Sequence, residues 1–442
     1  MKYDVVIIGA GITGLTAARQ ILLSGKSVCV IEKEAVVGGL ASTFQFSNKV
    51  EVEKFYHHWF NSDIHVLELI EDLDLTHLVT STSTNTGLYF NKRIWRLSSP
   101  LDLLRFKPLM FLDRIRLGLM VLKVKSVRDW KSLEGLTIRE WLEPLVGPRA
   151  FKVVWEPLIS SKFASFSEKV SAVWMWKKLD LRGGTRKKGG SEELLYLSGG
   201  FNVLIKKMVS EIQELGGVIE VSTNATQLHT SQDNHFDYVL TDRSTIFARH
   251  AFVTTAFPVV AKLIATHNDK KWLESLSRVN YLGNICLVLC LSKSLSDTYW
   301  LNVNDPGFPF VGVIEHTNFD ASSNYAETHI VYISKYLDIK QAEWSFTDLE
   351  YFEYAYPYIK EMFPNFEKEW VINFKVWRAE YAQPVVEKYY SEYLPSKKTP
   401  VENIYLSNMA HIYPEDRGTN YAVRDGKVAA EIILSKLRDL EN

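Results

Sequence analysis

The sequence predicts an α/β fold in which a doubly wound parallel sheet carries an inserted lobe of mixed sheet and helices. The first observation is residues 4–8 (DVVII), a β-branched run that ends at Gly9. Residues 12–24 then carry apolar and small side chains at helical spacing, and residues 27–31 form a second apolar run. Strand, helix and strand in this order open a doubly wound, Rossmann-like sheet.

The rest of the chain is long enough for further lobes, since 46% of its 442 residues are hydrophobic. Leu, Met and Trp recur at helical spacing from about residue 95 to 181, which predicts a helical region. Strand patterns at residues 284–291 and 328–334 predict a second sheet. The expected domains are a discontinuous doubly wound domain (1–62, 195–265 and 396–442), a mainly helical insertion (63–194) and a substrate domain of sheet and helices (266–395).

Charge and cysteine content exclude several classes of protein. The 51 Lys and Arg residues balance 52 Asp and Glu residues, so the chain lacks the basic excess expected of a nucleic-acid-binding protein. Three cysteines cannot form a disulfide framework, and the amino terminus runs directly into an apolar strand without a basic leader. Charges interrupt every apolar stretch before the roughly 18 residues that a membrane span needs. We therefore expect a cytoplasmic protein.

One segment departs from this balance. Residues 92–131 hold eleven Lys and Arg against three Asp, a local charge of +8. Leucine, methionine and phenylalanine crowd between these cations at residues 101–112. Three interpretations are open: a solvated helical face, a peripheral contact of residues 95–125 with the inner face of a membrane, or a pocket for an anionic substrate.

A glycine-rich turn follows the first strand at residues 9–14 (GAGITG). Gly9 permits the tight turn, Gly11 lets the backbone approach a pyrophosphate, and Gly14 lets the helix pack on the strand. Glu32 ends the second strand, where a carboxylate can accept hydrogen bonds from ribose hydroxyls. This arrangement predicts a dinucleotide site. Its expected contacts are Gly9, Gly11, Ile12, Thr13, Gly14, Glu32 and Lys33.

A second glycine pair lies in residues 37–42 (VGGLAS), where backbone amides can reach a second phosphate or a flavin edge. With this pair, residues 4–42 resemble the FAD-binding start of the protoporphyrinogen oxidase, amine oxidase and phytoene desaturase superfamily. Leu40 stands where that superfamily usually has Arg. The resemblance implies an FAD cofactor, with Gly39, Leu40 and Ala41 added to its contacts.

Further segments extend the resemblance over nearly the whole chain. Residues 197–226 resemble the superfamily's second FAD segment, which implies an adenine contact at the backbone of Ala225, and residues 377–384 resemble its aromatic segment near the isoalloxazine. Arg378 in the latter is a candidate catalytic residue. Residues 404–409 stand in place of a strand that ends in Gly-Asp in the superfamily, and the acid is absent here, as in UDP-galactopyranose mutase. The expected substitutes for this acid are Asn408 and the backbone amide of Met409. The resemblance also implies that Asn420, Tyr421 and Ala422 begin the last helix against the flavin.

Residues 55–60 (FYHHWF) are similar to an aromatic and histidine segment of UDP-galactopyranose mutase that lies beside the flavin. Tyr56 is therefore expected at the cofactor, and His57 and His58 are candidate catalytic residues. An imidazole there could stabilise the charge of reduced flavin or transfer a proton. The alternative is that one histidine packs in the core and the other faces water. No third ligand at suitable spacing accompanies the pair, so no metal site is expected.

The leading hypothesis is an FAD-dependent oxidoreductase that takes hydride from an apolar or amphipathic small molecule onto flavin N5, as the superfamily resemblance implies. Residues 283–285 stand where amine oxidases place a lysine, which disfavours amine oxidation. One alternative is a mutase-like or reductase-like enzyme that uses reduced flavin on a nucleotide-linked or lipid-linked sugar. The basic segment at residues 92–131 and Arg417 or Arg424 would then bind phosphate. A second alternative is a flavin-bound scaffold without catalytic activity.

Overall fold

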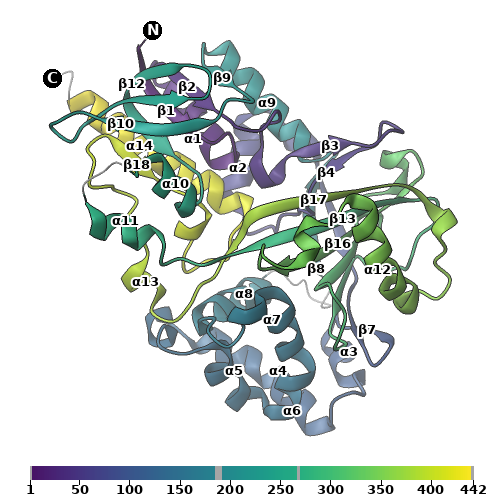
Figure 1. Cartoon of the computed structure of the whole chain (residues 1–442). Helices are drawn as coiled ribbons and strands as arrows, with labels where there is room; N and C mark the ends of the chain where they lie inside the picture. Colours follow the sequence, from purple (N-terminus) through teal and green to yellow (C-terminus); the bar gives the residue numbers. More distant parts are fainter. Residues whose placement is uncertain (1, 185–191, 266–268, 440–442) are drawn as a thin grey trace.

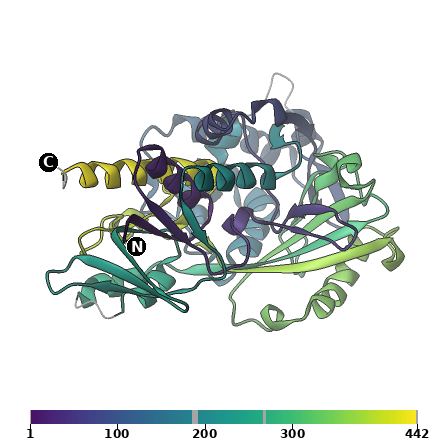
Figure 2. The ribbon, with the colours of Figure 1, turned by 90° about the horizontal axis from the view of Figure 1, so that it is seen from above.

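The computed structural model describes residues 2–184, 192–265 and 269–439. It contains two seven-stranded sheets and, below them in Figure 1, a lobe of helices. The sheets lie beside one another rather than face to face, and the long strand β17 of the second sheet ends on the side that faces the first sheet (Figure 2). The α/β class predicted from the opening strand, helix and strand is confirmed.

The first sheet has the strand order β10-β11-β12-β1-β2-β9, with β18 paired to β12. Its central strands β12, β1, β2 and β9 are parallel, and every residue of β2 is buried. Parallel strands covered on both faces read as continuous apolar runs, which explains the runs that predicted β1 and β2. The strands are β1 (Lys2–Ile8), β2 (Val28–Ile31), β9 (Val218–Glu220), β10 (Ala225–Thr230), β11 (Phe236–Thr241), β12 (Thr245–Val253) and β18 (Ile404–Leu406).

Helices from both ends of the chain cover this sheet. The first helix and the last helix pack tightly, because an added side-chain carbon at Gly426 would lie 2.6 Å from the carbonyl oxygen of Thr13. This contact brings the amino-terminal end of the last helix to the first glycine turn. The helices around the first sheet are α1 (Ile12–Leu23), α2 (Ile64–Asp72), α9 (Phe201–Glu214), α10 (Phe257–Leu263), α11 (Lys270–Leu276), α13 (Tyr390–Tyr393) and α14 (Thr419–Asp439).

The second sheet has the order β17-β13-β16-β15-β14-β6-β7 and two different faces. On one face, Ile285, Leu287 and Leu289 of β13 pack against the aromatic-rich helix α12 (Asp348–Met362). The opposite face carries Cys286, Val288 and aromatic residues, and it belongs to the core shared with the first sheet. The strands are β6 (Thr86–Phe90), β7 (Arg93–Arg96), β13 (Tyr281–Leu291), β14 (Trp300–Val303), β15 (Gly312–Glu315), β16 (His329–Leu337) and β17 (Val371–Pro384).

The remaining elements are the helical lobe and two short sheets. Apolar positions of the lobe form one core with part of the first sheet. The lobe helices are α3 (Pro100–Arg105), α4 (Phe111–Ser126), α5 (Ile138–Val146), α6 (Pro148–Ala150), α7 (Glu156–Phe163) and α8 (Ala172–Gly184). The short sheets pair β3 (Thr43–Gln45) with β4 (Glu51–Glu53) and β5 (Val79–Thr84) with β8 (Glu192–Leu197).

The segment expected to be mainly helical, residues 63–194, also supplies strands. Its β6 and β7 extend the second sheet, with β6 parallel to β14 although more than 200 residues separate them. Pairing between such distant segments leaves no local sequence signal, because it depends on which edge the folded sheet exposes. Among the described residues, no helix is both long and apolar enough to span a membrane.

Several histidines are buried, and burial changes how stability depends on pH. His250 on β12 is 0% exposed, and neither of its ring nitrogens has a hydrogen-bond partner among the described residues. Burial, with a smaller contribution from Arg249, lowers the pKa of His250 to about 4. The unfolded chain, with an ordinary histidine pKa of about 6.5, therefore takes up this proton first as the pH falls.

We predict that His250→Leu flattens the pH dependence of stability. In the wild-type protein, a fall in pH from about 6.5 to 4 lowers the free energy of unfolding. Each histidine of this kind contributes up to about 1.4 kcal/mol per pH unit. The variant loses one of these contributions and keeps most of its stability at pH 7, since no hydrogen bond is removed. Urea unfolding at pH 7 and near pH 5 measures the difference. Equal slopes for the two proteins would contradict the prediction.

Candidate flavin and substrate site

The first glycine turn lies where β1 ends and α1 begins. Gly9 has φ +103°, a conformation that favours glycine. A side-chain carbon at Gly14 would lie 2.0 Å from the Gly9 carbonyl oxygen, so Gly14 allows the helix to pack on the strand. A side-chain carbon at Gly11 would meet nothing closer than the Gly39 Cα at 4.0 Å. The protein itself therefore leaves space at Gly11 for a ligand.

The second glycine turn packs directly against the first. The Gly38 N–H donates a hydrogen bond to the Ala10 carbonyl at 2.8 Å. Gly38 and Gly39 have φ values of +107° and +59°, and a short 3-10 helix, Gly39–Ala41, follows. The predicted contacts Ile12, Thr13, Gly39, Leu40 and Ala41 thus lie on two adjoining backbone turns at the carboxyl ends of β1 and β2.

Glu32 lies directly after β2 and is 8% exposed. Its Oε2 accepts a hydrogen bond from the Ala10 N–H at 2.9 Å, and its Oε1 accepts one from the Glu34 N–H at 2.9 Å. Each carboxylate oxygen can accept a further hydrogen bond, so Glu32 can still bind ribose hydroxyls. Lys33 differs: its side chain is 69% exposed and pairs with Glu34 at 3.5 Å, at the surface of the protein.

Ala225 begins β10, two residues after Thr223, whose N–H donates to the Glu32 carbonyl at 2.9 Å. This bond brings the segment before β10 to the end of β2. The backbone of Ala225 therefore lies on the same side of the first sheet as Glu32, where an adenosine would be held.

The amide side chains of Asn408 and Asn420 form hydrogen bonds within the protein. Asn408 Nδ2 donates to the Thr255 carbonyl at 2.8 Å, and Asn408 Oδ1 accepts from the Ala410 N–H at 3.0 Å. Asn420 Oδ1 accepts from the N–H groups of His65 and Val66, at the start of α2. Both side chains thus hold neighbouring segments. Met409 begins the short helix after β18, and Tyr421 and Ala422 lie in the first turn of α14.

The site can be tested for its fit to a dinucleotide by asking which buried polar atoms lack a protein partner. Thr255 Oγ1, beside Gly9, is one of them. On the second sheet, the Tyr332 hydroxyl and Trp377 Nε1 are two more. Such atoms are costly to bury unless a ligand or water bonds to them. The open space at Gly11 and these atoms fit a dinucleotide that reaches from the glycine turns to the second sheet.

Aromatic residues line the second sheet opposite α12. The ring of Tyr56 lies edge-on to Trp300, with ring centroids 5.0 Å apart, and contacts Tyr332 at 6.2 Å. His58 Nδ1 lies 2.9 Å from the Tyr299 hydroxyl, and its ring also contacts Trp300. The predicted residues Tyr56 and His58 are thus brought together with Trp300 and Tyr332 in one aromatic wall.

His57 is held in one tautomer by a local hydrogen bond. Its Nδ1 lies 2.6 Å from the Phe55 carbonyl, which can only accept, so Nδ1 carries the hydrogen and Nε2 is an acceptor. Burial, with a smaller contribution from Arg417, lowers the pKa of His57 to about 4. At neutral pH His57 is therefore a neutral imidazole that can accept a hydrogen bond or a proton at Nε2.

Arg378 lies on the other face of the second sheet. It pairs with Ile285 across the β13–β17 ladder, so it points toward α12, whereas its neighbour Trp377 pairs with Cys286 and points toward the aromatic wall. Its guanidinium donates to the Phe346 carbonyl and lies 3.9 Å from Asp348. The structure therefore does not bring Arg378 together with His57 and His58.

A cluster of cations lies where the helical lobe meets the segment before α14. Arg417 donates from Nε to Gln383 at 2.9 Å and from Nη2 to the Tyr336 hydroxyl at 2.7 Å. The ammonium groups of Lys162 and Lys178 lie over the Trp174 ring, at 5.2 and 4.9 Å from its centroid. Asp416 accepts from Trp174 Nε1 at 2.9 Å. Although burial alone would raise it, the pKa of Asp416 is lowered by Lys178, Lys162 and Arg417.

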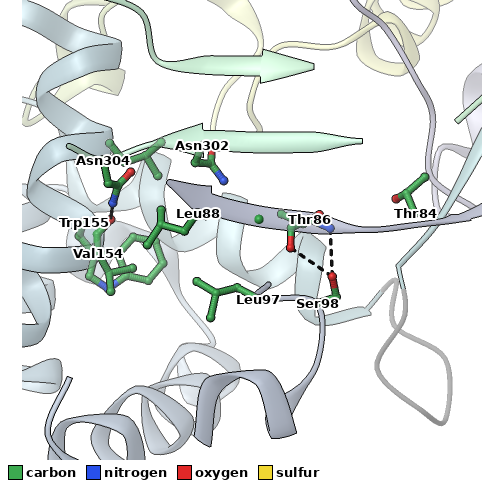
Figure 3. Close-up of a pocket in the computed structure, with 11 residues that line it drawn as sticks. Thr84, Thr86, Leu88, Leu97, Ser98, Val154, Trp155, Asn302 and Asn304 are labelled. Carbon is green, nitrogen blue, oxygen red and sulfur yellow. Dashed lines mark hydrogen bonds between the residues drawn. The ribbon is translucent and has the colours of Figure 1, made fainter. Parts of the chain in front are cut away.

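A cavity of about 170 Å³ lies between the second sheet and the helical lobe (Figure 3). It is close in size to cavities that hold one benzene-sized group. Thr84 Oγ1, Trp155 Nε1 and Asn304 Oδ1 in its lining have no partner among the described residues, and none of the lining residues is charged. Asn302, another lining residue, accepts a hydrogen bond from Trp300 of the aromatic wall at 3.0 Å. The cavity therefore adjoins the wall and suits a neutral group.

The arrangement agrees with comparison to known proteins. Residues 12–434 match the family model described as flavin containing amine oxidoreductase. The chain belongs to this family. Membership implies a flavin cofactor, and the resemblance seen in residues 4–42 is confirmed.

Individual relatives of the chain are distant. Amine oxidase [flavin-containing] B from Sus scrofa is 24% identical over 247 residues, which cover 50% of this chain and 47% of the relative. The chain thus spans about half the length of this curated relative.

Solved structures cover nearly the whole chain. An Exiguobacterium protein described as a candidate protoporphyrinogen oxidase is 15% identical, with a TM-score of 0.78, over 98% of this chain and 99% of the other. Reduced UDP-galactopyranose mutase is 14% identical, with a TM-score of 0.77, over 98% of this chain and 96% of the other. These similarities establish the fold, a flavoprotein fold of the amine oxidase type.

Some residues of the site could not be found from the sequence. Tyr299 is bonded to a histidine 241 positions earlier in the chain, and Asn304 donates to carbonyls of Val153 and Val154 in the helical lobe. Neither residue lies in a motif. They flank β14, which pairs with β6 and β15, and the pairing with the distant β6 has no local signal.

The two glycines of the first turn should respond differently to alanine. We predict that Gly11→Ala folds normally but binds flavin at least about tenfold more weakly, because its methyl group occupies ligand space. Gly14→Ala should lose about 1–3 kcal/mol of unfolding free energy or more, because its methyl group meets the Gly9 carbonyl. Flavin titration and urea unfolding of the flavin-free protein separate the two effects.

Gly118→Ala is the matched control, since nothing lies within 4 Å of the added carbon and the residue is in α4. It should leave flavin binding unchanged. If Gly11→Ala binds flavin as well as Gly118→Ala does, the dinucleotide does not pass over Gly11.

Proposed function

We propose that the flavin is FAD and that the protein is an FAD-dependent oxidoreductase. The first sheet offers what the adenosine diphosphate part of FAD needs: a buried carboxylate at Glu32 for ribose and two adjoining glycine turns for the pyrophosphate. Ala225, Met409, Tyr421 and Ala422 would meet the cofactor mainly through backbone groups.

The substrate is proposed to be apolar or amphipathic. The observation that carries this proposal is the aromatic wall of Tyr56, Trp300 and Tyr332, which adjoins a cavity with an uncharged lining. Bound FAD would supply the redox chemistry, in which a substrate C–H bond breaks and its hydride, with both electrons, passes to N5. The wall would orient the substrate and exclude water from the reacting carbon.

His57 is proposed to accept the proton that the substrate loses together with the hydride. Its neutral imidazole presents Nε2 as an acceptor, and its Nδ1–H bond to Phe55 keeps the ring in place. His58 would position the wall through Tyr299. Arg378 has no part in this proposal, because it lies on the opposite face of the sheet.

A second candidate is an enzyme that works from reduced flavin on a nucleotide-linked or lipid-linked sugar. The cation cluster of Lys162, Lys178 and Arg417 favours it, since all three lie close enough to Asp416 to lower its pKa, and ammonium and guanidinium groups are the side chains that bind phosphates. The fold likeness to UDP-galactopyranose mutase is compatible with this candidate.

Anaerobic visible spectroscopy tests the proposed function. The FAD-loaded protein is recorded before and after addition of NADH or NADPH, and then of protoporphyrinogen as an amphipathic reductant. We expect the flavin to stay oxidised with nicotinamides and to be bleached by the amphipathic substrate. Bleaching by a nicotinamide would favour the sugar enzyme. A protein that cannot bind FAD would overturn the cofactor, and a flavin that no small molecule reduces would favour a scaffold.

The cation cluster provides a further test of the second candidate. If the cluster binds a diphosphate, UDP perturbs the flavin spectrum, and Lys178→Met raises its dissociation constant about 10- to 100-fold through loss of one charge-assisted contact. Lys177→Met is the matched control. Lys177 is next to Lys178 in the sequence, but its ammonium group pairs with Asp180. An oxidoreductase of apolar substrates predicts no response of the spectrum to UDP in any of these proteins.

A further inference from the structure

Helices α3 and α4 carry an unusual number of exposed apolar side chains. Nine of the 22 large hydrophobic residues exposed in the described chain lie within residues 101–122. Phe111, Leu112 and Leu122 are 63%, 68% and 65% exposed. We call this surface the α3–α4 patch; it consists of Leu101, Leu104, Met110, Phe111, Leu112, Ile115, Leu119, Val121 and Leu122.

The patch is not the inner face of a helix that is out of place. Helix α4 already packs an apolar stripe into the lobe through Leu117, Met120 and Val124. Leu112, Ile115, Leu119 and Leu122 form a second stripe at spacings of three and four residues on another side of the helix. An exposed apolar stripe of this size on a folded protein typically marks a surface that contacts another molecule or a membrane.

The charges around the patch have one sign. Residues 101–125 contain six Lys and Arg and two Asp. Asp113 is 8% exposed, and Asp102 caps α3 by accepting from the Ser98 and Ser99 N–H groups. Among the described residues, no ion pair joins Arg105, Lys107, Lys123 or Lys125 to a carboxylate, and all four are exposed. The rim of the patch is therefore positively charged.

We propose that the α3–α4 patch docks on the surface of an anionic lipid bilayer. Exposed Leu, Phe and Met side chains enter the boundary between headgroups and acyl chains, and the surrounding Lys and Arg residues bind lipid phosphates. The patch lies at the end of the molecule away from the first sheet, so docking leaves the dinucleotide site in solution (Figure 1).

A second copy of the chain suits the patch less well. A symmetric dimer places the same surface of both copies face to face, which would bring the six Lys and Arg residues of one copy against those of the other. Like charges held together in an apolar interface repel. An anionic bilayer has the apolar interior and the negative surface that the patch requires.

The position of the patch connects it to the cavity. Leu97 and Ser98 line the cavity and lead directly into α3. A bilayer on the α3–α4 patch would therefore lie near the chain segment that borders the cavity, and an apolar substrate dissolved in lipid would have a short path to it. Docking itself does not depend on the proposed reaction.

Vesicle co-sedimentation of the FAD-loaded protein tests the proposal. One set of vesicles contains phosphatidylcholine alone, and the other also contains phosphatidylglycerol. We expect binding to the anionic vesicles, weakened when salt rises from about 0.1 M to about 1 M. The variant Leu119→Gln/Leu122→Gln should need at least about tenfold more lipid for half-binding, since two exposed leucines no longer insert.

The matched control is Leu349→Gln/Ile432→Gln, which changes two exposed apolar residues elsewhere and should bind like the wild-type protein. The visible flavin spectrum of each variant reports that the fold is intact. Failure of the wild-type protein to bind anionic vesicles, or equal loss in both variants, would overturn the proposal. So would a dimer in light scattering that Leu119→Gln/Leu122→Gln converts to a monomer without any vesicle binding.

Discussion

The close approach of backbone to backbone at the first sheet is the constraint on which the rest of the structure depends. The two glycine turns touch through the bond from Gly38 to Ala10, and α1 lies so near β1 that Gly14 admits no side chain. Gly426 likewise lets α14 approach α1, since an added side-chain carbon would lie 2.6 Å from the Thr13 carbonyl oxygen. These contacts hold the beginning and the end of the chain together, and they put both glycine turns beside α14.

The two faces of the second sheet have different roles, because alternate residues of each strand point to opposite faces. Residues that point to one side, such as Ile285 and Leu287, are apolar and pack on α12. Residues that point to the other side include Tyr332 and Trp377, whose polar atoms have no protein partner in the described chain. One face therefore stabilises the sheet, while the other remains available to a ligand. The helical lobe contacts the second sheet through Lys162, whose ammonium group lies over the ring of Tyr336 on β16.

How far the site could be predicted depends on how local each contact is. The turn at residues 9–14 and Glu32 were predictable, because strand, turn and helix are adjacent in sequence and their spacing has a physical reason. The bond of His57 to Phe55 is equally local. Arg378 illustrates the limit. Its motif predicted a position near the flavin, but neighbouring residues of a strand point to opposite faces. Only the pairing of β17 with β13 shows that Arg378 points to the face covered by α12.

By itself, the sequence determined the fold class, the dinucleotide turn and the basic segment at residues 92–131, since periodicity, glycine spacing and charge are properties of short stretches. The tertiary structure alone decided the pairing of β6 with β14, the contact of His58 with Tyr299, and the roles of Asn408 and Asn420 inside the protein. It also decided which leucines of α4 face water. These features depend on packing between residues far apart in the chain, which no short stretch encodes.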